Sequence, residues 1–311
     1  MNANMQTPLG LGIDAGGTRT RWALANESGE VVAEGSVGGL SALQMSSEAG
    51  RQRIRESLME LAREVLPAGR PTRVHAGMTG ISEGGDALRV LIAESLGLMV
   101  DEVTLGSDIE IAYLDLFKPG EGYVVYAGTG CIAAFIDERG QLHRAGGRGA
   151  ILDDAGGGFW IACQALRHIW RAEDERPGSW EQSPMAVEVF KRIGGSDWPR
   201  SREFIYGSNS AEARGEIGKL ALAVAEVADI DPAASEILSE AGAELARLAR
   251  AMLSRFGPRP VALSGRVLEL HPLIEKSMRL ALPMSVQLQA RTSEAHVAAA
   301  RQAVRKMRIV K

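Results

Sequence analysis

The sequence predicts an α/β protein with two duplicated lobes, and a repeated pattern of strands and turns carries this prediction. Short apolar segments joined by turn residues form a meander of three strands over residues 9–35, and the same pattern returns over residues 122–145. Segments with helical spacing of apolar residues follow each copy. Repetition at a distance of roughly a hundred residues is typical of a duplicated lobe and not of a short-period solenoid.

The first lobe is expected to be a meander followed by alternating helices and strands. A helical pattern covers residues 47–66, and we expect it to break at Pro67 because proline removes a helical hydrogen bond. The other expected elements of this lobe are strands at residues 9–14, 20–25, 31–35, 73–78 and 102–105, and helices at residues 87–96 and 108–116.

The second lobe repeats the meander and is then mostly helical. Asp231 followed by Pro232 predicts a helix N-cap with proline at the first helical position. The last helix is expected to return to the first lobe, so that the lobes comprise residues 1–117 plus 292–311, and residues 118–291. The expected elements of the second lobe are strands at residues 122–127, 131–136, 141–145 and 260–263, helices at 157–169, 185–192, 211–227 and 231–256, and a loop at 196–199.

Composition argues against several classes of function. The 311 residues suggest about two domains, and the net charge of -4 gives no basic field for nucleic acid or an anionic membrane. Cys131 and Cys163 lie in apolar runs, which favours reduced thiols. The first eight residues lack the features of a secretory signal, and no stretch approaches the ~20 apolar residues of a membrane span. We therefore expect a cytoplasmic protein.

The first glycine turn has the composition of a phosphate-binding turn. Gly16 and Gly17 would let backbone N–H groups approach a phosphate closely, and Thr18 and Thr20 add hydroxyl donors. Asp14 ends an apolar strand, where a buried carboxylate needs a cation or several donors. A Mg²⁺ ion that bridges phosphates would supply that cation.

Gly128, Thr129 and Gly130 form an equivalent turn in the second copy. Residues 10–15, just before the first turn, and residues 128–133, which include the second, match the dinucleotide fingerprint G-x-G-x-x-A. That fingerprint requires a helix after the glycines, and strands are expected here. The sequence has no G-x-x-x-x-G-K-[ST] segment, which excludes a P-loop. A single glycine turn is more often a plain hairpin. Two such turns with threonine, in corresponding positions of two lobes, favour phosphate binding.

Four motifs in order carry a resemblance to one known family. Residues 14–20 resemble its first phosphate motif, Asp-Gly-Gly-Gly-Thr-Lys-Thr, and residues 126–131 resemble its second, which ends Gly-Thr-Gly-Ser. Residues 146–158 are similar to its Gly-Gly-Trp-Gly and Gly-Asp-Glu-Gly-Ser-Gly segments, and residues 262–267 to its adenosine motif. The chain thus resembles the family that joins N-acetylglucosamine kinases with ATPases related to benzoyl-CoA reductase activation, within the acetate-kinase/sugar-kinase/heat-shock/actin superfamily.

The resemblance implies a two-lobed, actin-like ATPase fold (ribonuclease H-like) with a nucleotide cleft between the lobes. ATP would place its phosphates between the two glycine turns and its adenosine near Gly265 and Arg266, with Mg²⁺ near Asp14. Members of the family transfer the γ-phosphate to the 6-hydroxyl of a hexose, so the expected substrate is an amino sugar, N-acetylglucosamine or glucosamine. A homodimer is common among such kinases.

The resemblance also assigns the residues around the sugar. By its position at the start of a helix, Asp108 alone would be interpreted as an N-cap. The resemblance makes Asp108 the catalytic base that accepts the proton of the sugar hydroxyl. It gives Gly147 and Asp154 the role of gripping the sugar, the latter by charge-assisted hydrogen bonds. Thr79 and Ser41 are expected to line the same site.

Several positions that contact substrate depart from the family pattern. Cys131 and Ile132 replace polar groups, Arg148 replaces tryptophan, and Arg266 replaces a glycine beside the adenosine. The phosphate and base positions are kept, so the sequence indicates phosphoryl transfer more firmly than it indicates which sugar is used. Two alternatives stay open. One is an ATPase that activates a partner enzyme, whose relatives hold an iron–sulfur cluster through cysteines; the other is a non-catalytic sugar-binding protein of the same fold.

Overall fold

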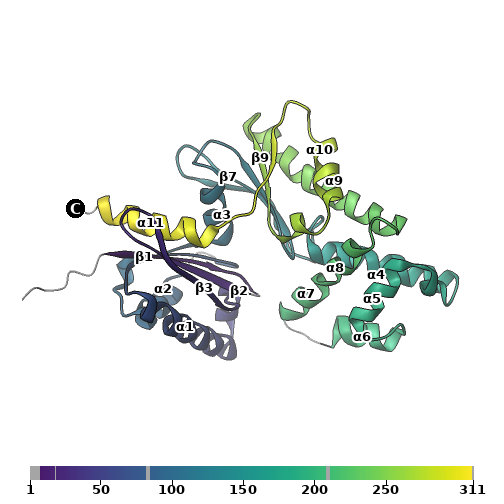
Figure 1. Ribbon diagram of the computed structural model, residues 1–311, viewed down its shortest axis with the longest axis horizontal. Helices are drawn as coiled ribbons and strands as arrows, with labels where there is room; N and C mark the ends of the chain where they lie inside the picture. Colours follow the sequence, from purple (N-terminus) through teal and green to yellow (C-terminus); the bar gives the residue numbers. More distant parts are fainter. Residues whose placement is uncertain (1–7, 18, 82–84, 208–210, 310–311) are drawn as a thin grey trace, which may run out of the picture. The chain divides into compact units, whose positions relative to one another are not determined.

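The chain divides into two compact units. The computed structural model describes residues 8–17, 19–81, 85–207 and 211–309. The first unit comprises Met1–Asp115 and Ser293–Lys311, and the second comprises Leu116–Thr292 (Figure 1). The C-terminal segment therefore belongs to the same unit as the N-terminal part of the chain.

The first unit is built on a five-stranded mixed sheet with the order β3-β2-β1-β4-β5. The first three strands form an antiparallel meander, and β4 and β5 extend the sheet from β1 in parallel. The parallel strands β1, β4 and β5 therefore end at the same edge of the sheet. The strands are β1 (Leu9–Ala15), β2 (Arg19–Ala25), β3 (Val31–Gly38), β4 (Pro71–Met78) and β5 (Val103–Ser107).

Helices cover both faces of this sheet. Leu11, Trp22 and Leu24 point to the face that packs against α1 and α2, whereas Ala23 and Ala25 point to α11. This alternation follows from the two-residue period of a strand. The helices are η1 (Ala42–Ser46), α1 (Glu48–Ala68), α2 (Asp86–Leu96), η2 (Val100–Glu102), α3 (Asp108–Leu116) and α11 (Ala295–Ile309). The last helix packs on β1, β2 and β4, as predicted.

The second unit repeats the sheet of the first. Its order is β10-β9-β6-β7-β8, with β6 in the place of β1 and the same pattern of antiparallel and parallel neighbours. The strands are β6 (Tyr123–Ala127), β7 (Cys131–Ile136), β8 (Leu142–Gly146), β9 (Val261–Ser264) and β10 (Leu288–Ala290). The two sheets confirm the predicted α/β fold with duplicated mixed sheets.

Helices make up most of the rest of the second unit. Asp231 caps α9 as predicted, because its carboxylate accepts hydrogen bonds from the N–H groups of Ala233 and Ala234. Trp170 makes edge contacts with Phe190 and Trp198, so these aromatic side chains serve packing. The helices are α4 (Gly158–Glu175), η3 (Ser179–Gln182), α5 (Pro184–Ile193), α6 (Trp198–Tyr206), α7 (Ala211–Gly218), α8 (Leu220–Glu226), α9 (Pro232–Phe256), η4 (Arg266–Glu269) and α10 (Pro272–Ala281).

Three predicted helix boundaries were wrong. Helix α1 continues through Pro67 and ends at Ala68, because a proline in the last turn removes only one helical hydrogen bond. The single helix predicted at residues 211–227 is broken between Gly218 and Leu220 into α7 and α8. The predicted loop at residues 196–199 ends in α6, which Asp197 caps.

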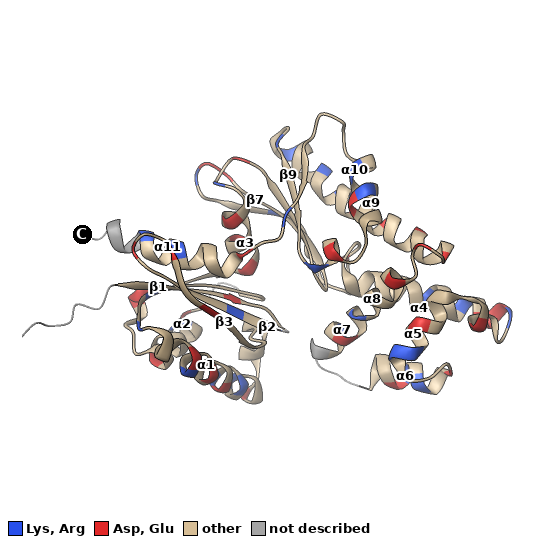
Figure 2. Ribbon diagram, in the orientation of Figure 1, with Lys and Arg blue, Asp and Glu red and all other residues tan. Residues whose placement is uncertain are grey.

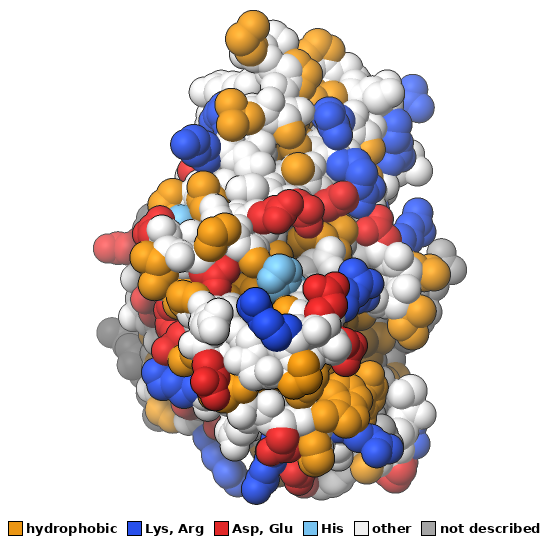
Figure 3. Space-filling model, turned by 90° about the vertical axis from the view of Figure 1, so that its right-hand side faces the viewer, with side chains coloured by type: hydrophobic (Ala, Val, Ile, Leu, Met, Phe, Trp, Pro, Cys, Tyr) orange, Lys and Arg blue, Asp and Glu red, His pale blue; other side chains and the backbone are white. Residues whose placement is uncertain are grey.

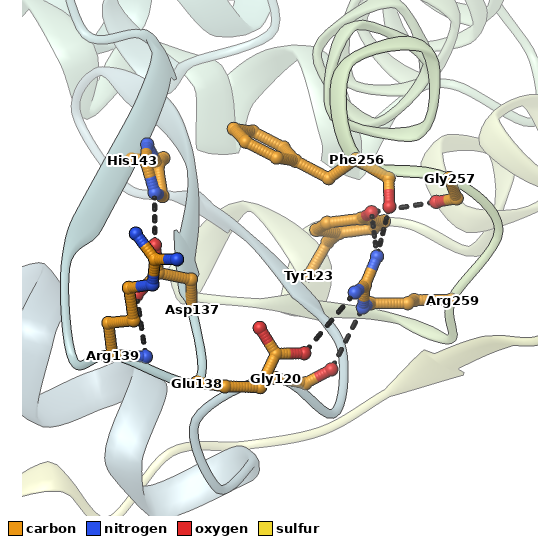
Figure 4. A network of polar contacts seen from close by, with 9 residues as sticks. All are labelled: Gly120, Tyr123, Asp137, Glu138, Arg139, His143, Phe256, Gly257 and Arg259. Carbon is orange, nitrogen blue, oxygen red and sulfur yellow. Dashed lines mark hydrogen bonds and ion pairs between the residues drawn. The ribbon is translucent and has the colours of Figure 1, made fainter.

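A polar and aromatic network fixes the start of the second sheet (Figure 4). The guanidinium of Arg259 lies over the ring of Phe135, 4.8 Å from its centroid, and donates a hydrogen bond of 3.1 Å to the Tyr123 hydroxyl. That hydroxyl donates in turn to the carbonyl of Gly257 at 2.7 Å. Burial is the main cause that raises the pKa of Tyr123. The network therefore anchors β6 at the end opposite to its glycine turn.

Charged residues of both signs are spread over the surface helices. Acidic and basic residues are interspersed along α1 (Figure 2), and hydrophobic side chains lie among charged ones on the face shown in Figure 3. Within the described part of the chain, none of the helices has the length and apolar character needed to cross a bilayer.

Candidate functional site residues in the two units

The first glycine turn connects β1 to β2 and is only partly enclosed. The Gly16 N–H donates to the carbonyl of Arg19 at 3.1 Å, and the Gly16 carbonyl accepts from the Leu40 N–H at 3.0 Å. A Cβ added to Gly17 would meet nothing within 4 Å, whereas one on Gly16 would lie 3.3 Å from the Arg19 carbonyl oxygen. Open space therefore lies beside Gly17, as a phosphate-binding turn requires.

The two threonines of this turn have different positions. Thr18 lies outside the described residues. Thr20 is 1% exposed, on the face of β2 that also carries Trp22 and Leu24. Among the described residues, its buried hydroxyl has no hydrogen-bond partner. The predicted contact between Thr20 and a phosphate would need this hydroxyl to become accessible.

Asp14 lies at the end of β1 and already has a cationic partner. Its Oδ2 atom forms an ion pair of 2.7 Å with Nη2 of Arg21, the residue opposite it on β2. The same Nη2 lies 3.4 Å from the carbonyl oxygen of Ser293. Asp14 and Arg21 side chains are 18% and 32% exposed, so the pair is within reach of a ligand. The carboxylate is of the type that Mg²⁺ prefers, and the metal would share it with Arg21 or replace Arg21.

Asp108 stands between the end of β5 and the first turn of α3. Its Oδ1 accepts a hydrogen bond of 2.8 Å from the Ile109 N–H, and its Oδ2 accepts one of 2.6 Å from the Thr79 hydroxyl. The neighbouring Ser107 hydroxyl accepts from the Glu110 N–H at 3.3 Å and so has the capping role. Asp108 is half-buried, and both of its oxygens are held in fixed directions.

Ser41 and Thr79 meet at the same edge of the sheet. The Thr79 N–H donates to the carbonyl of Ala15 at 3.0 Å, which places Thr79 beside the start of the first glycine turn. The Thr79 carbonyl accepts from the Ser41 hydroxyl at 3.2 Å and from the Ala42 N–H at 3.0 Å. The first unit thus brings Ser41, Thr79 and Asp108 together beyond the ends of β1, β4 and β5.

The second glycine turn connects β6 to β7 and is enclosed by α4. The Gly128 N–H donates to the Gly130 carbonyl at 2.8 Å. The carbonyls of Gly128 and Thr129 accept from the first N–H groups of α4, those of Gly158 at 2.8 Å and Phe159 at 2.9 Å. The start of α4 therefore holds the turn in one conformation by satisfying its carbonyl groups.

Gly265 lies directly beside this turn. Its φ of +99° is in a region that favours glycine, and a Cβ there would overlap the carbonyl oxygen of Ala127. Strands β6 and β9 are parallel neighbours, so the Gly128 and Gly265 turns follow at the same edge of the second sheet. Arg266 is exposed at the start of η4. The position fits a nucleotide whose phosphates and adenosine contact adjacent turns.

Asp154 is buried and carries an ion pair that the sequence did not reveal. Its side chain is 5% exposed, and its Oδ2 pairs with Nη2 of Arg214 from α7. Burial raises the pKa of Asp154, while Arg214 opposes this shift. A Cβ on Gly130 would lie 2.5 Å from Arg214 Nη2 and 2.7 Å from Asp154 Oδ2. The Asp154 carboxylate is therefore next to the second glycine turn.

Gly147 directly follows β8, and Cys131 begins the neighbouring strand β7. Gly147 has a φ of +63° and donates its N–H to the Cys131 carbonyl at 3.0 Å. The Cys131 thiol donates to the carbonyl of Ala155 at 2.9 Å, and burial is the main cause that raises its pKa to about 12. A protonated, buried thiol is a poor metal ligand. Among the described residues no group of three or more His, Cys, Asp and Glu could hold a metal ion.

Comparisons with known proteins agree with the family resemblance that the motifs carry. N-acetyl-D-glucosamine kinase of Dictyostelium discoideum is 27% identical over 183 residues, which cover 55% of this chain and 57% of that protein. N-acetylmuramic acid/N-acetylglucosamine kinase of Clostridium acetobutylicum is 27% identical over 168 residues, which cover 53% of this chain and 55% of that protein. The chain thus spans little more than half the length of these relatives.

A solved structure and a family match cover almost the whole chain. A candidate N-acetylglucosamine kinase from Chromobacterium violaceum has a TM-score of 0.71 at 23% identity, over 96% of this chain and 99% of that one. At this low identity the likeness shows the fold alone, which is that of actin-like ATPases. Residues 11–289 match the BadF/BadG/BcrA/BcrD ATPase family, and the protein belongs to this family.

Proposed function

We propose that the protein is an ATP-dependent kinase that phosphorylates the 6-hydroxyl of an amino sugar, N-acetylglucosamine or glucosamine. The hydrogen bond of 2.6 Å from Thr79 to Asp108, at the common edge of β1, β4 and β5, carries this proposal. It holds a half-buried carboxylate in a fixed direction beside the first glycine turn. A carboxylate held in this way has the properties that a general base for a hydroxyl group requires.

Asp108 would accept the proton of the attacking hydroxyl as the phosphoryl group is transferred. The N–H of Ile109 and the hydroxyl of Thr79 each bind one carboxylate oxygen and leave its remaining lone pairs for the substrate. Such a base contributes about 10²- to 10⁴-fold to the rate. Positioning and electrostatic stabilisation supply the larger part of phosphoryl transfer.

The nucleotide would be bound by the glycine turns of the two units. Gly16 and Gly17, with Thr18 and Thr20, and Gly128, Thr129 and Gly130 would offer N–H and hydroxyl donors to phosphate oxygens. Gly265 and Arg266 would contact the adenosine. Asp14 would hold Mg²⁺, which neutralises charge on the phosphates when it is bound.

The sugar would be bound by Ser41 and Thr79 of the first unit and by Gly147 and Asp154 of the second. The amino sugar is chosen because both curated relatives are N-acetylglucosamine kinases by name. We also infer a cytoplasmic location, where ATP and reduced thiols are found. A homodimer is a further expectation, which light scattering of the purified protein would test.

An ATPase that activates a partner through an iron–sulfur cluster is the less favoured function. The sequence has two cysteines, and Cys131 is committed to a hydrogen bond within the second unit. Such a cluster needs thiolate ligands. A colourless protein without bound iron would agree with this conclusion.

The experiment is a measurement of ADP release with a panel of hexoses. We expect N-acetylglucosamine or glucosamine to stimulate ADP release at least tenfold over the rate without sugar, and glucose to stimulate it less. ATP binding without stimulation by any sugar would instead support a non-catalytic sugar-binding protein. ADP release that responds only to a partner protein would favour the activating ATPase.

A further inference from the structure

Helix α7 packs directly on the second glycine turn. A Cβ on Gly218, the last residue of α7, would lie 3.3 Å from the Thr129 methyl group. A Cβ on Gly158 at the start of α4 would lie 3.4 Å from the Gly218 carbonyl oxygen. The absence of side chains at Gly218 and Gly158 thus allows α7 to approach both the turn and the helix that holds it.

This packing places one cationic side chain at the turn. Arg214 lies four residues before Gly218 and therefore on the same face of α7. Its Nη2 atom lies 2.5 Å from the position that a Cβ on Gly130 would take, and it pairs with Asp154. Its guanidinium carbon also lies over the ring of Phe159, 5.8 Å from the centroid. The ion pair with Asp154 and the contact with the Phe159 ring hold the guanidinium beside Gly130.

The Arg214–Asp154 pair differs from an ordinary surface ion pair. Asp154 is buried, but the Arg214 side chain is 37% exposed and so remains partly accessible. Its Nε atom is buried and has no partner among the described residues. A guanidinium has five N–H donors, and the pair with Asp154 does not use them all.

We propose that Arg214 is a phosphate-binding residue of the second glycine turn, and that Asp154 and Phe159 orient it. A planar guanidinium binds phosphate oxygens through paired N–H donors, and it keeps its charge at any physiological pH. The inference rests on the proposed function, because the ligand is the phosphate chain of ATP. The inference gives Asp154 a positioning role. A contact between Asp154 and the sugar would then use the carboxylate oxygen that does not pair with Arg214.

Calorimetric titration of the full chain with MgATP and MgADP tests the inference. In Arg214→Gln we expect the Kd of MgATP to rise about 10- to 100-fold, which is the range for loss of a charge-assisted hydrogen bond. Arg214→Lys keeps the charge but loses the paired geometry of the guanidinium. Its Kd for MgATP should lie between those of Arg214→Gln and the wild type. Arg247→Gln is the matched control, since Arg247 pairs with the adjacent Asp153 at 2.8 Å and should leave the Kd within about twofold.

Arg214→Gln leaves the buried Asp154 without its counter-ion, which can unfold the protein. The double variant Arg214→Gln/Asp154→Asn removes both charges and should fold, with the same loss of MgATP affinity. Weaker salt dependence of the Kd in both variants would support a phosphate contact, because salt screens charge contacts. If the Kd of MgATP is unchanged in these variants while the KM for the sugar increases, the inference is overturned. Failure of the wild type to bind MgATP would instead refute the proposed function.

Discussion

The two glycine turns occupy equivalent places in sheets of the same order, yet they are supported in different ways. In the first, Asp14 pairs with Arg21 on the adjacent strand, and space is open beside Gly17. In the second, Asp154 pairs with a residue 60 positions away in the chain, and α4 and α7 enclose the turn. A duplicated sheet thus keeps the position of a turn while the supporting contacts change from local to tertiary.

The difference predicts a division of tasks between the units. The first unit holds the half-buried Asp108 next to an open turn, which suits a reacting group that substrates must reach. The second holds a rigid turn with a fixed guanidinium, which suits binding of the nucleotide. The following substitutions test this division, beginning with the largest expected effect.

Replacement of Asp108 should affect the chemical step alone. In Asp108→Asn we expect kcat to fall about 10²- to 10⁴-fold, because the amide cannot accept the proton. The Kd of MgATP should stay within about twofold of the wild-type value. Asp101→Asn, in η2 just before β5, is the control and should keep full activity. A variant at Asp108 with wild-type kcat would remove this carboxylate from the mechanism.

Alanine substitutions of one glycine in each turn should have unequal effects. A Cβ at Gly130 meets Arg214 and Asp154, so Gly130→Ala should lower the free energy of unfolding by about 1–3 kcal/mol and weaken MgATP binding. A Cβ at Gly17 meets nothing within 4 Å, so Gly17→Ala should change stability by less than about 0.5 kcal/mol. Thermal unfolding measures the change in stability of both variants. Equal losses at the two positions would contradict the difference in enclosure.

The Arg21–Asp14 pair should set the Mg²⁺ requirement. In Arg21→Gln we expect the Mg²⁺ concentration for half-maximal ADP binding to fall about three- to tenfold, since the metal no longer competes with a cation for the carboxylate. Arg53→Gln is the control, because Arg53 is exposed on α1, and it should leave the Mg²⁺ requirement unchanged. A higher Mg²⁺ requirement in Arg21→Gln would mean that Arg21 helps to bind phosphate.

The smallest effect concerns His296 at the start of α11. Burial, followed by the charge of Arg21, lowers the pKa of His296 below its ordinary value of 6.5. The unfolded chain therefore binds the proton more readily, so the stabilisation is present above pH 6.5 and is lost as the pH falls. Between pH 7.5 and 5.5 we expect a decrease in Tm of roughly 2 °C from this group. This decrease in Tm should be smaller in His296→Gln. It should be retained in His168→Gln, because His168 is exposed.

Most of the fold could be predicted from local patterns. The strand-and-turn meanders, the cap at Asp231 and the closing helix depend on residues near one another in sequence, and they were confirmed. The break between α7 and α8 was missed because apolar residues continue across Gly218 with helical spacing. Packing of Gly218 on Thr129 accounts for the position of α7, and periodicity does not report such contacts.

The candidate site could be predicted in part. Asp14 lies at the end of β1, and Thr79 and Asp108 directly follow β4 and β5, so their proximity could be expected from parallel strands that end at one edge. The roles assigned to them come from the family resemblance and stay predictions. Arg214 could not, because no motif surrounds it and its partner is distant in the sequence. Arg21 and Arg214 form ion pairs with two of the three acids that the sequence singled out, Asp14 and Asp154, and only the tertiary contacts reveal these pairs.

The most direct test of the account is the identity of the product. The purified protein is incubated with MgATP and N-acetylglucosamine or glucosamine, and the products are measured by ³¹P NMR and mass spectrometry. The account predicts one sugar 6-phosphate for each ADP, and neither product above background with Asp108→Asn. ADP with free phosphate and unmodified sugar, at equal rates in the wild type and in Asp108→Asn, would contradict it.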